Sequence, residues 1–131
     1  MKKLMILGAS ILQLPAIEQA KRMGLQVIAV DRDPEAIGFG VEGVIREVIS
    51  TNDIPSVLAS AKKHKIDGIM TLASDMPMRT IAKVSTELGL AGISEKTAYR
   101  ATDKAAMRKT LEKAGVPIPV YYKVSNEQEF F

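Results

Sequence analysis

The chain has 131 residues, a net charge of +3 and a hydrophobic fraction of 47%, which suits one globular domain that can bury a core without disulfides or metals. It has no cysteine and one histidine, His64. This composition excludes a disulfide framework, a thiolate metal site and a metal site built from several histidines.

The apolar run at residues 4–7 is too short for the hydrophobic region of a signal peptide. No segment approaches the roughly 20 apolar residues that cross a bilayer. We therefore expect a cytoplasmic protein with no membrane partner.

The first half of the chain alternates between strand and helix patterns. The apolar run 4–7 is typical of a parallel strand buried on both faces. A helix is expected from about 12 to 23, because Pro15 suits its first turn and Gly24 its end. A second buried strand at 27–30 follows.

Residues 31–34 close that strand, and residues 35–43, which contain three glycines, indicate a loop. The less apolar segment 44–49 predicts a strand at the edge of the sheet.

In the second half, Asp53 and Pro55 predict the start of a helix that presents Ile54, Leu58 and Ala61 on one face. A fourth strand is expected at 66–72. Asp75 and Pro77 open a third helix that ends at Gly89. Four apolar residues of this helix are expected to face the core: Met78, Ile81, Val84 and Leu88.

This order of elements predicts an α/β fold, a doubly wound, Rossmann-like parallel sheet with the strand order 3-2-1-4. We assign residues 1–93 to this domain. Residues 94–131 are expected to form a helical linker and the start of a second, truncated domain.

Within the linker, helices are expected at 94–101 and 103–114, followed by an extended segment at 116–119 and a strand-like segment at 120–124. Ser125 and Gln128 fit a capping box, in which each side chain satisfies the other residue's backbone N–H group. The chain then ends on two phenylalanines after about two helical turns. We interpret this as a sign of truncation; the alternative is a short terminal helix docked on the core.

Lys96, Arg100, Lys104 and Arg108 recur every four residues and would share a face of one continuous helix. Thr102 and Asp103 indicate a helix start, which would break this face. We therefore interpret the basic residues as a solvated surface and expect no nucleic-acid partner.

The first candidate site is the turn after the first strand, with Gly8, Ala9, Ser10 and Gln13. A glycine turn that enters a helix offers backbone N–H groups to an anion. Asp31 follows at nearly the distance of a dinucleotide-binding fingerprint. However, Ser10 and Gln13 replace the second and third glycines of that fingerprint. A small polar or anionic substrate fits better, with Ser10 and Gln13 as hydrogen-bond donors.

The second candidate pair is Ser74 and Asp75, which follow the fourth strand and would face the Gly8 turn across the edge of the sheet. Asp75 would equally serve as a helix cap, and Asp31 as a turn residue. His64, among three lysines, is expected on the surface. No residue pattern indicates a catalytic group or a metal site on this chain.

Residues 101–108, beginning Ala-Thr-Asp-Lys, and the Gly-Val-Pro-Ile-Pro of residues 115–119 resemble the entry into the nucleotide-binding region of ATP-grasp ligases. The resemblance extends back over Gly-Ala-Ser-Ile-Leu-Gln-Leu-Pro at 8–15, Ala-Val-Asp-Arg-Asp-Pro at 29–34, Ile-Asp-Gly-Ile at 66–69 and Leu-Gly-Leu at 88–90. These segments are similar to the N-terminal, pre-ATP-grasp lobe of the carbamoyl-phosphate-synthase-like and purine-biosynthetic members.

The resemblance implies a substrate-binding lobe of an enzyme that activates a carboxylate with ATP and Mg²⁺ as an acyl phosphate, which an amine or thiol then attacks. It implies that Lys104 contacts the phosphates of ATP. The phosphate loop, adenine-binding strands and metal ligands of the family would lie in a C-terminal ATP-grasp domain that these residues lack. The chain alone is therefore expected to be inactive and to require no cofactor of its own.

Two other interpretations stay open. Gly8 and Asp31 would also suit a stand-alone regulatory module that senses NAD or an adenine nucleotide. The chain could also act as a scaffold that forms a homodimer. The sequence does not identify the substrate.

Overall fold

The computed structural model describes residues 1–130. Its centre is a parallel sheet of four strands, in the order β3-β2-β1-β4. The strands are β1 (Lys3–Leu7), β2 (Gln26–Asp31), β3 (Ile45–Val48) and β4 (Gly68–Thr71). The predicted α/β class, the strand order and the edge position of the third strand are confirmed.

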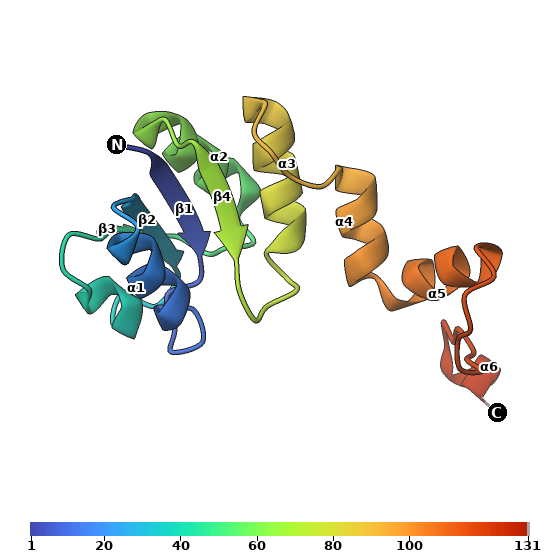
Figure 1. Cartoon of the computed structure of the whole chain (residues 1–131). Helices are drawn as coiled ribbons and strands as arrows, with labels where there is room; N and C mark the ends of the chain where they lie inside the picture. The colour runs from blue at the N-terminus through green and yellow to red at the C-terminus, as the bar shows by residue number, and fades with distance from the viewer. Residues whose placement is uncertain (131) are drawn as a thin grey trace.

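Helices cover both faces of the sheet (Figure 1). They are α1 (Leu14–Arg22) and the short 3-10 helix η1 (Ile37–Gly40) on one face, and α2 (Ile54–His64) and α3 (Met78–Leu88) on the other.

Strands β1, β2 and β4 each contribute to two cores, because successive side chains of a strand point to opposite faces. Met5 and Ile28 pack in the core beneath α2 and α3. Ile6 and Ala29 pack in the core beneath α1 and η1. The continuous apolar runs of the sequence therefore reflect a sheet that is buried on both sides.

The expected loop at 35–43 contains the 3-10 helix η1, whose Phe39 is buried. The chain approaches the sheet closely here. A side chain at Gly38 would lie 2.6 Å from Ile17 Cδ1 and 2.8 Å from the Ala9 carbonyl oxygen. The loop prediction missed η1 because its packing depends on contacts with distant residues.

The predicted buried face of α2 was only partly right. Ala61 is buried, but Ile54 and Leu58 are half-buried while Val57 is fully buried. Because α2 packs against both the sheet and α3, its buried stripe is displaced from the face that the sequence pattern indicated. The core-facing residues predicted for α3 do lie in or against the core.

The C-terminal part extends away from the sheet (Figure 1). It contains α4 (Glu95–Thr102), α5 (Lys104–Lys113) and α6 (Glu127–Phe130). Ser94 and Asp103 cap α4 and α5 by accepting hydrogen bonds from the N–H groups of Thr97 and Ala106. The predicted break in the helix at Asp103 is confirmed.

Two predictions for this part were wrong. The strand-like segment 120–124 forms no strand within the described residues, since no strand lies beside it to accept its backbone groups. The expected capping box of Ser125 and Gln128 is not formed. Asn126 accepts a hydrogen bond from the N–H of Glu129, and Glu129 accepts one from the N–H of Ser125. Phe131, the second terminal phenylalanine, lies outside the described residues.

Candidate functional site

A pocket of about 360 Å³ lies where the loops that follow all four strands meet. This edge holds the carboxyl ends of the strands, and the strand order reverses there between β1 and β4, the place where open α/β sheets bind ligands. The lining residues are Leu7, Gly8, Ser10, Leu12, Gln13, Asp31, Arg32, Ser50, Thr51, Asn52, Ala73, Ser74 and Pro77.

The turn after β1 is shaped by Gly8 and Gln13. Gly8 has a φ of +97°, and a Cβ atom there would lie 2.8 Å from Gln13 Cδ. Gln13 is buried. Its Oε1 accepts hydrogen bonds from the Ser10 hydroxyl (2.7 Å) and N–H (3.2 Å), and its Nε2 donates to the Leu72 carbonyl (2.6 Å). The amide of Gln13 therefore ties the turn to the end of β4. This bond uses one of the two hydrogens on Nε2, and the expected role of Gln13 as a donor to a ligand stays a prediction.

Asp31 joins two loops of the pocket. Its Oδ2 accepts a hydrogen bond from the N–H of Ala9 (2.8 Å), and its Oδ1 accepts one from the N–H of Asp33 (3.0 Å). Ala9 is fully buried and does not line the pocket.

These contacts change the expected chemistry of the turn after β1. The N–H groups of Gly8, Ala9, Ser10 and Leu12 all have acceptors within the protein. The turn was expected to offer such groups to an anion. In this structure these four groups hold the shape of the pocket, and the expected anion site at this turn stays a prediction.

The opposite wall comes from the loops after β3 and β4. Ser50, Thr51 and Asn52 follow β3, and the Thr80 hydroxyl fixes their loop by donating to the Thr51 carbonyl oxygen (2.7 Å). Ser74 lies on the lining after β4, beside Ala73, whose φ of +57° is rare for a residue with a side chain.

Asp75 does not line the pocket. Its exposed carboxylate has no hydrogen-bond or ion-pair partner within residues 1–130, so it does not cap α3 in the way that a helix-capping role would require. The N-terminal cap of α3 is Pro77 instead.

Sequence reasoning missed the Ser50–Asn52 loop and Arg32. The signal was available, because the polar segment 50–52 directly follows the third strand and must therefore reach the same sheet edge.

The pocket is suited to binding. Among its lining residues, Asp31 and Arg32 carry the only charges, and no His, Cys or Lys is present. The hydroxyl groups of Ser50 and Ser74 supply neutral donors and acceptors, whereas the Ser10 hydroxyl already donates to Gln13 Oε1 and offers acceptor capacity. The loops beside the pocket carry exposed apolar side chains: Ile11 is 63% exposed, Leu12 57% and Met76 65%. A polar pocket with an exposed apolar rim is typical of an interface between domains.

Lys104 lies elsewhere. It is the first residue of α5, is exposed and does not line this pocket. The structure thus brings together Gly8, Ser10, Gln13, Asp31 and Ser74, and leaves Ala9, Asp75 and Lys104 outside the lining.

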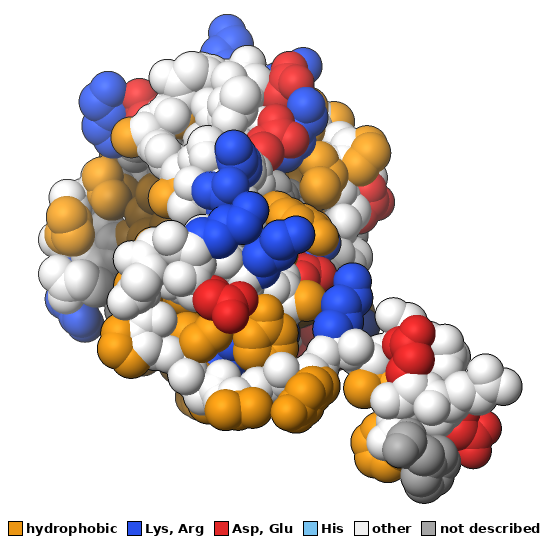
Figure 2. Space-filling view, turned by 90° about the vertical axis from the view of Figure 1, so that its right-hand side faces the viewer, with side chains coloured by type: hydrophobic (Ala, Val, Ile, Leu, Met, Phe, Trp, Pro, Cys, Tyr) orange, Lys and Arg blue, Asp and Glu red, His pale blue; other side chains and the backbone are white. Residues whose placement is uncertain are grey.

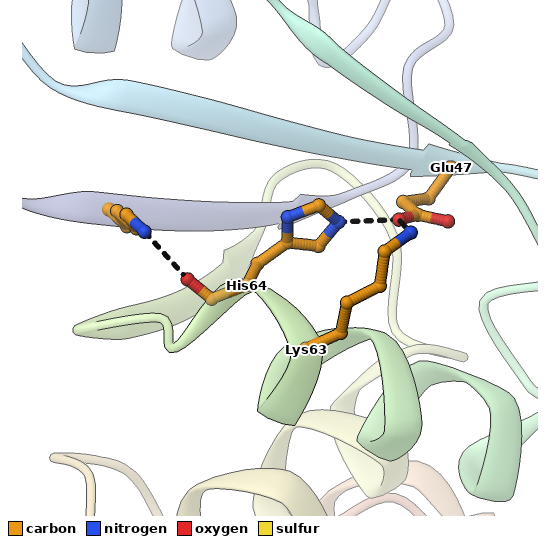
Figure 3. A network of polar contacts seen from close by, with 4 residues as sticks. Glu47, Lys63 and His64 are labelled. Atoms are coloured by element: carbon orange, nitrogen blue, oxygen red, sulfur yellow. Dashed lines mark hydrogen bonds and ion pairs between the residues drawn. The ribbon is translucent and has the colours of Figure 1, made fainter.

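His64 was expected on the surface, and this prediction was wrong. Its side chain is only 15% exposed, and its Nε2 lies 2.5 Å from Glu47 Oε1, while Lys63 Nζ lies 3.1 Å from the same oxygen (Figure 3). Burial by itself raises the pKa of Glu47, but the hydrogen bonds and charges of His64 and Lys63 outweigh it and hold this pKa below its ordinary value. The cluster joins α2 to the edge strand β3, which explains why a histidine among lysines is half-buried.

Within residues 1–130, no three or more His, Cys, Asp or Glu side chains gather in a way that could hold a metal ion. No helix in the same range is long and apolar enough to cross a membrane.

No protein-family model and no curated protein sequence matches the chain. Several solved structures are similar to the chain. Phosphoribosylglycinamide synthetase from Anaerococcus prevotii is 27% identical with a TM-score of 0.84, over 98% of this chain and 33% of that chain. N5-carboxyaminoimidazole ribonucleotide synthetase from Thermotoga maritima is 26% identical with a TM-score of 0.78, over 99% and 35%.

L-amino acid ligase from Bacillus licheniformis, at 22% identity and a TM-score of 0.81 over 99% of this chain and 33% of that chain, shares the fold. The chain spans about a third of the length of each of these proteins. These enzymes are ATP-grasp ligases. In fold, and in spanning about a third of their length, the chain is similar to the N-terminal lobe of these ligases.

Proposed function

We propose that this chain is the substrate-binding lobe of an ATP-dependent ligase that joins a small carboxylate to an amine or a thiol. The observation that carries the proposal is the hydroxyl-lined pocket at the carboxyl edge of the sheet, which lies at the switch point of the strand order. The exposed apolar rim formed by Ile11, Leu12 and Met76 supports it, because a second domain that covered this rim would close the pocket.

The proposed reaction has two steps. A carboxylate oxygen of the substrate attacks the γ-phosphorus of ATP, and the bond to the bridging β–γ oxygen breaks to release ADP. The amine or thiol then attacks the acyl carbon, loses a proton and displaces phosphate. In this scheme the chain binds and orients the substrate through Ser10 and Ser74.

The residues of this chain fit ATP at one point. Lys104 is exposed and has no ion-pair partner among the described residues, so its ammonium group is available to a phosphate oxygen. We assign no Mg²⁺ ligand to this chain, since residues 1–130 hold no suitable cluster. The ATP-grasp domain, supplied by a longer polypeptide or by a separate subunit, would provide the metal ligands, and the chain alone would release no phosphate from ATP.

The first test measures the mass of the gene's natural protein in cell lysate with an antibody against this domain. A band well above 14.2 kDa directs the search to phosphate release from ATP by that product, measured over a panel of small carboxylates with amine and thiol acceptors. If none of them stimulates phosphate release, the proposal is wrong.

The second test assigns the pocket. In the enzyme that contains the ATP-grasp domain, Ser10→Ala is expected to raise the KM for the carboxylate or the acceptor about tenfold, because it removes a hydroxyl that lines the pocket. Asp75→Ala is expected to act more weakly, since Asp75 reaches the substrate only if the loop after β4 closes. Lys104→Ala is expected to raise the KM for ATP alone. Unchanged kinetics for Ser10→Ala would remove this pocket from the substrate site.

The nucleotide-sensor interpretation receives less support, because the Asp31 carboxylate already accepts two backbone hydrogen bonds where a dinucleotide site needs it for a ribose. Titration of the chain with NADH and with ATP separates the two. Binding of NADH without binding of ATP would reverse the ranking.

A further inference from the structure

The positive charge of the protein is concentrated on one pair of helices. Residues 94–116, which include α4 and α5, contain six basic and three acidic residues, a net charge of +3 that equals that of the whole chain. The remaining residues contain twelve of each kind. This asymmetry shows that the charge belongs to a local surface.

A groove of about 610 Å³ lies between these helices. Lys96 and Arg100 of α4 line one wall, and Lys109 and Lys113 of α5 line the other. The floor includes Tyr99 and small residues, and no Asp or Glu lines the groove. Figure 2 views the molecule from the side of α5 and α6 and shows Lys and Arg side chains gathered on this face.

None of the four cations has a carboxylate within ion-pair distance among the described residues. Lys83 of α3, by contrast, forms ion pairs with Glu87 and Glu95. Four unpaired cations around one groove create a local positive potential that attracts anions.

The groove is separate from the two sites already described. It shares no residue with the pocket at the sheet edge. Lys104 lies nine residues before Lys113 on α5, which at 100° per residue places it about 180° around the helix. The break at Asp103 therefore leaves Lys104 off the groove and brings Lys109 and Lys113 to face α4.

We propose that this groove binds a linear phosphate chain, as found in inorganic polyphosphate or in the triphosphate of a nucleotide. A phosphate chain offers charged oxygens along its length, so cations on both walls can contact it at once. The two helices, of eight and ten residues, also frame a site of limited length.

The test is calorimetric titration of the chain with inorganic tripolyphosphate at about 50 mM and about 150 mM salt, because screening weakens such contacts. The groove variant is Lys109→Ala with Lys113→Ala. The matched control is Lys62→Ala with Lys65→Ala, which removes the same charge from the exposed end of α2. Thermal unfolding confirms that each variant keeps its fold, and Lys109→Arg with Lys113→Arg tests rescue.

We expect the groove variant to bind at least about tenfold more weakly, the control to change less than about twofold, and the arginine variant to retain binding. ATP distinguishes the two sources of the phosphate chain. Equal affinity for ATP and tripolyphosphate indicates that the groove recognises the phosphate chain alone. Tighter binding of ATP that is lost in the groove variant indicates that the groove binds a nucleotide.

Absence of binding by the wild type at the lower salt concentration, or an equal loss in the groove and control variants, would overturn the proposal. Neither result bears on the ligase function, which depends on the sheet-edge pocket and on Lys104.

Discussion

The two parts of the molecule are stabilised by different means. In residues 1–93 two hydrophobic cores lie on either side of the sheet, and residues such as Met5, Ile28 and Val57 are fully buried. In residues 94–130 the only fully buried hydrophobic residue described is Ala98, and α5 and α6 bury none.

The helical part depends on local contacts instead. Caps at Ser94 and Asp103 begin its helices. Contacts with α3 link it to the sheet domain, and the buried Ala98 lies on α4. Arg79 of α3 donates a hydrogen bond to Thr102 (2.8 Å) and lies 5.0 Å from the centre of the Tyr99 ring. Lys83 Nζ lies 3.6 Å from Glu95 Oε1. The buried sheet therefore positions the pocket through many apolar contacts, whereas α5 and Lys104 are held by few.

The largest expected effect comes from comparing a buried residue of the sheet with a half-buried residue of α5. Ile28→Ala should lower the free energy of unfolding by about 3 kcal/mol, because the deleted side chain is fully buried. Leu111→Ala, at a half-buried position of α5, should cost less than about 1 kcal/mol. Urea denaturation measures both. Similar losses would show that α5 belongs to the same cooperative core.

The second prediction concerns the turn that shapes the pocket. Gly8→Ala should cost about 2 kcal/mol or more, because the new Cβ would strain a backbone of positive φ and meet Gln13, whose amide is bonded at both ends and cannot move away. Gly24→Ala is the control. Its φ is also positive, at +76°, but nothing lies within 4 Å of the new atom, so it should cost only about 1 kcal/mol. Equal costs would mean that Gln13 does not restrict the turn.

The third prediction concerns the helical part alone. Asp103→Ala should destabilise α5 by about 1 kcal/mol, because it removes the acceptor of the Ala106 N–H, while Asp103→Asn should retain most of the cap. Amide hydrogen exchange should show faster exchange in α5 and unchanged protection in the sheet. Faster exchange in β1 would show that the two parts are coupled more tightly than their contacts indicate.

The smallest effect is the pH dependence of the cluster in Figure 3. Because His64 and Lys63 hold the pKa of Glu47 below its ordinary value of 4.5, this cluster contributes stability above that pH and loses it as the pH falls through the lowered pKa. Glu47→Gln should therefore show a shallower loss of stability in acid than the wild type. Asp67, whose pKa the hydrogen bonds of Lys2 and Lys3 also lower, stays in both proteins as an internal reference. Identical acid profiles would remove Glu47 from the acid response.

The sequence predicted the elements that depend on local signals. The helix starts at Asp53, Ser94 and Asp103 and the helix end at Gly89 follow from short-range hydrogen bonds and backbone geometry, and each lies within a residue or two of its expected place. The edge position of β3 follows from its weaker hydrophobicity. The capping box predicted at Ser125 did not form, because Asn126 accepts the N–H of Glu129 and Glu129 accepts the N–H of Ser125 instead.

The candidate site was predictable in position but less so in role. Residues after buried parallel strands must meet at one sheet edge, so Gly8, Ser10, Asp31 and Ser74 could be grouped from the sequence alone. Whether Gln13 faces a ligand or the Leu72 carbonyl depends on how far apart β1 and β4 lie, and the sequence does not contain that distance.

Periodicity, caps and glycines by themselves therefore determined the parallel α/β fold, its strand order and the edge where the pocket lies, because these follow from the choice of residues over a few turns of chain. Only the tertiary structure decided that His64 packs half-buried against Glu47, that the Asp31 carboxylate accepts a hydrogen bond from the N–H of Ala9, and that Lys109 and Lys113 line the groove with α4 while Lys104 does not. Each of these depends on the distance and orientation between elements far apart in sequence or separated by a break, which packing sets and local sequence does not.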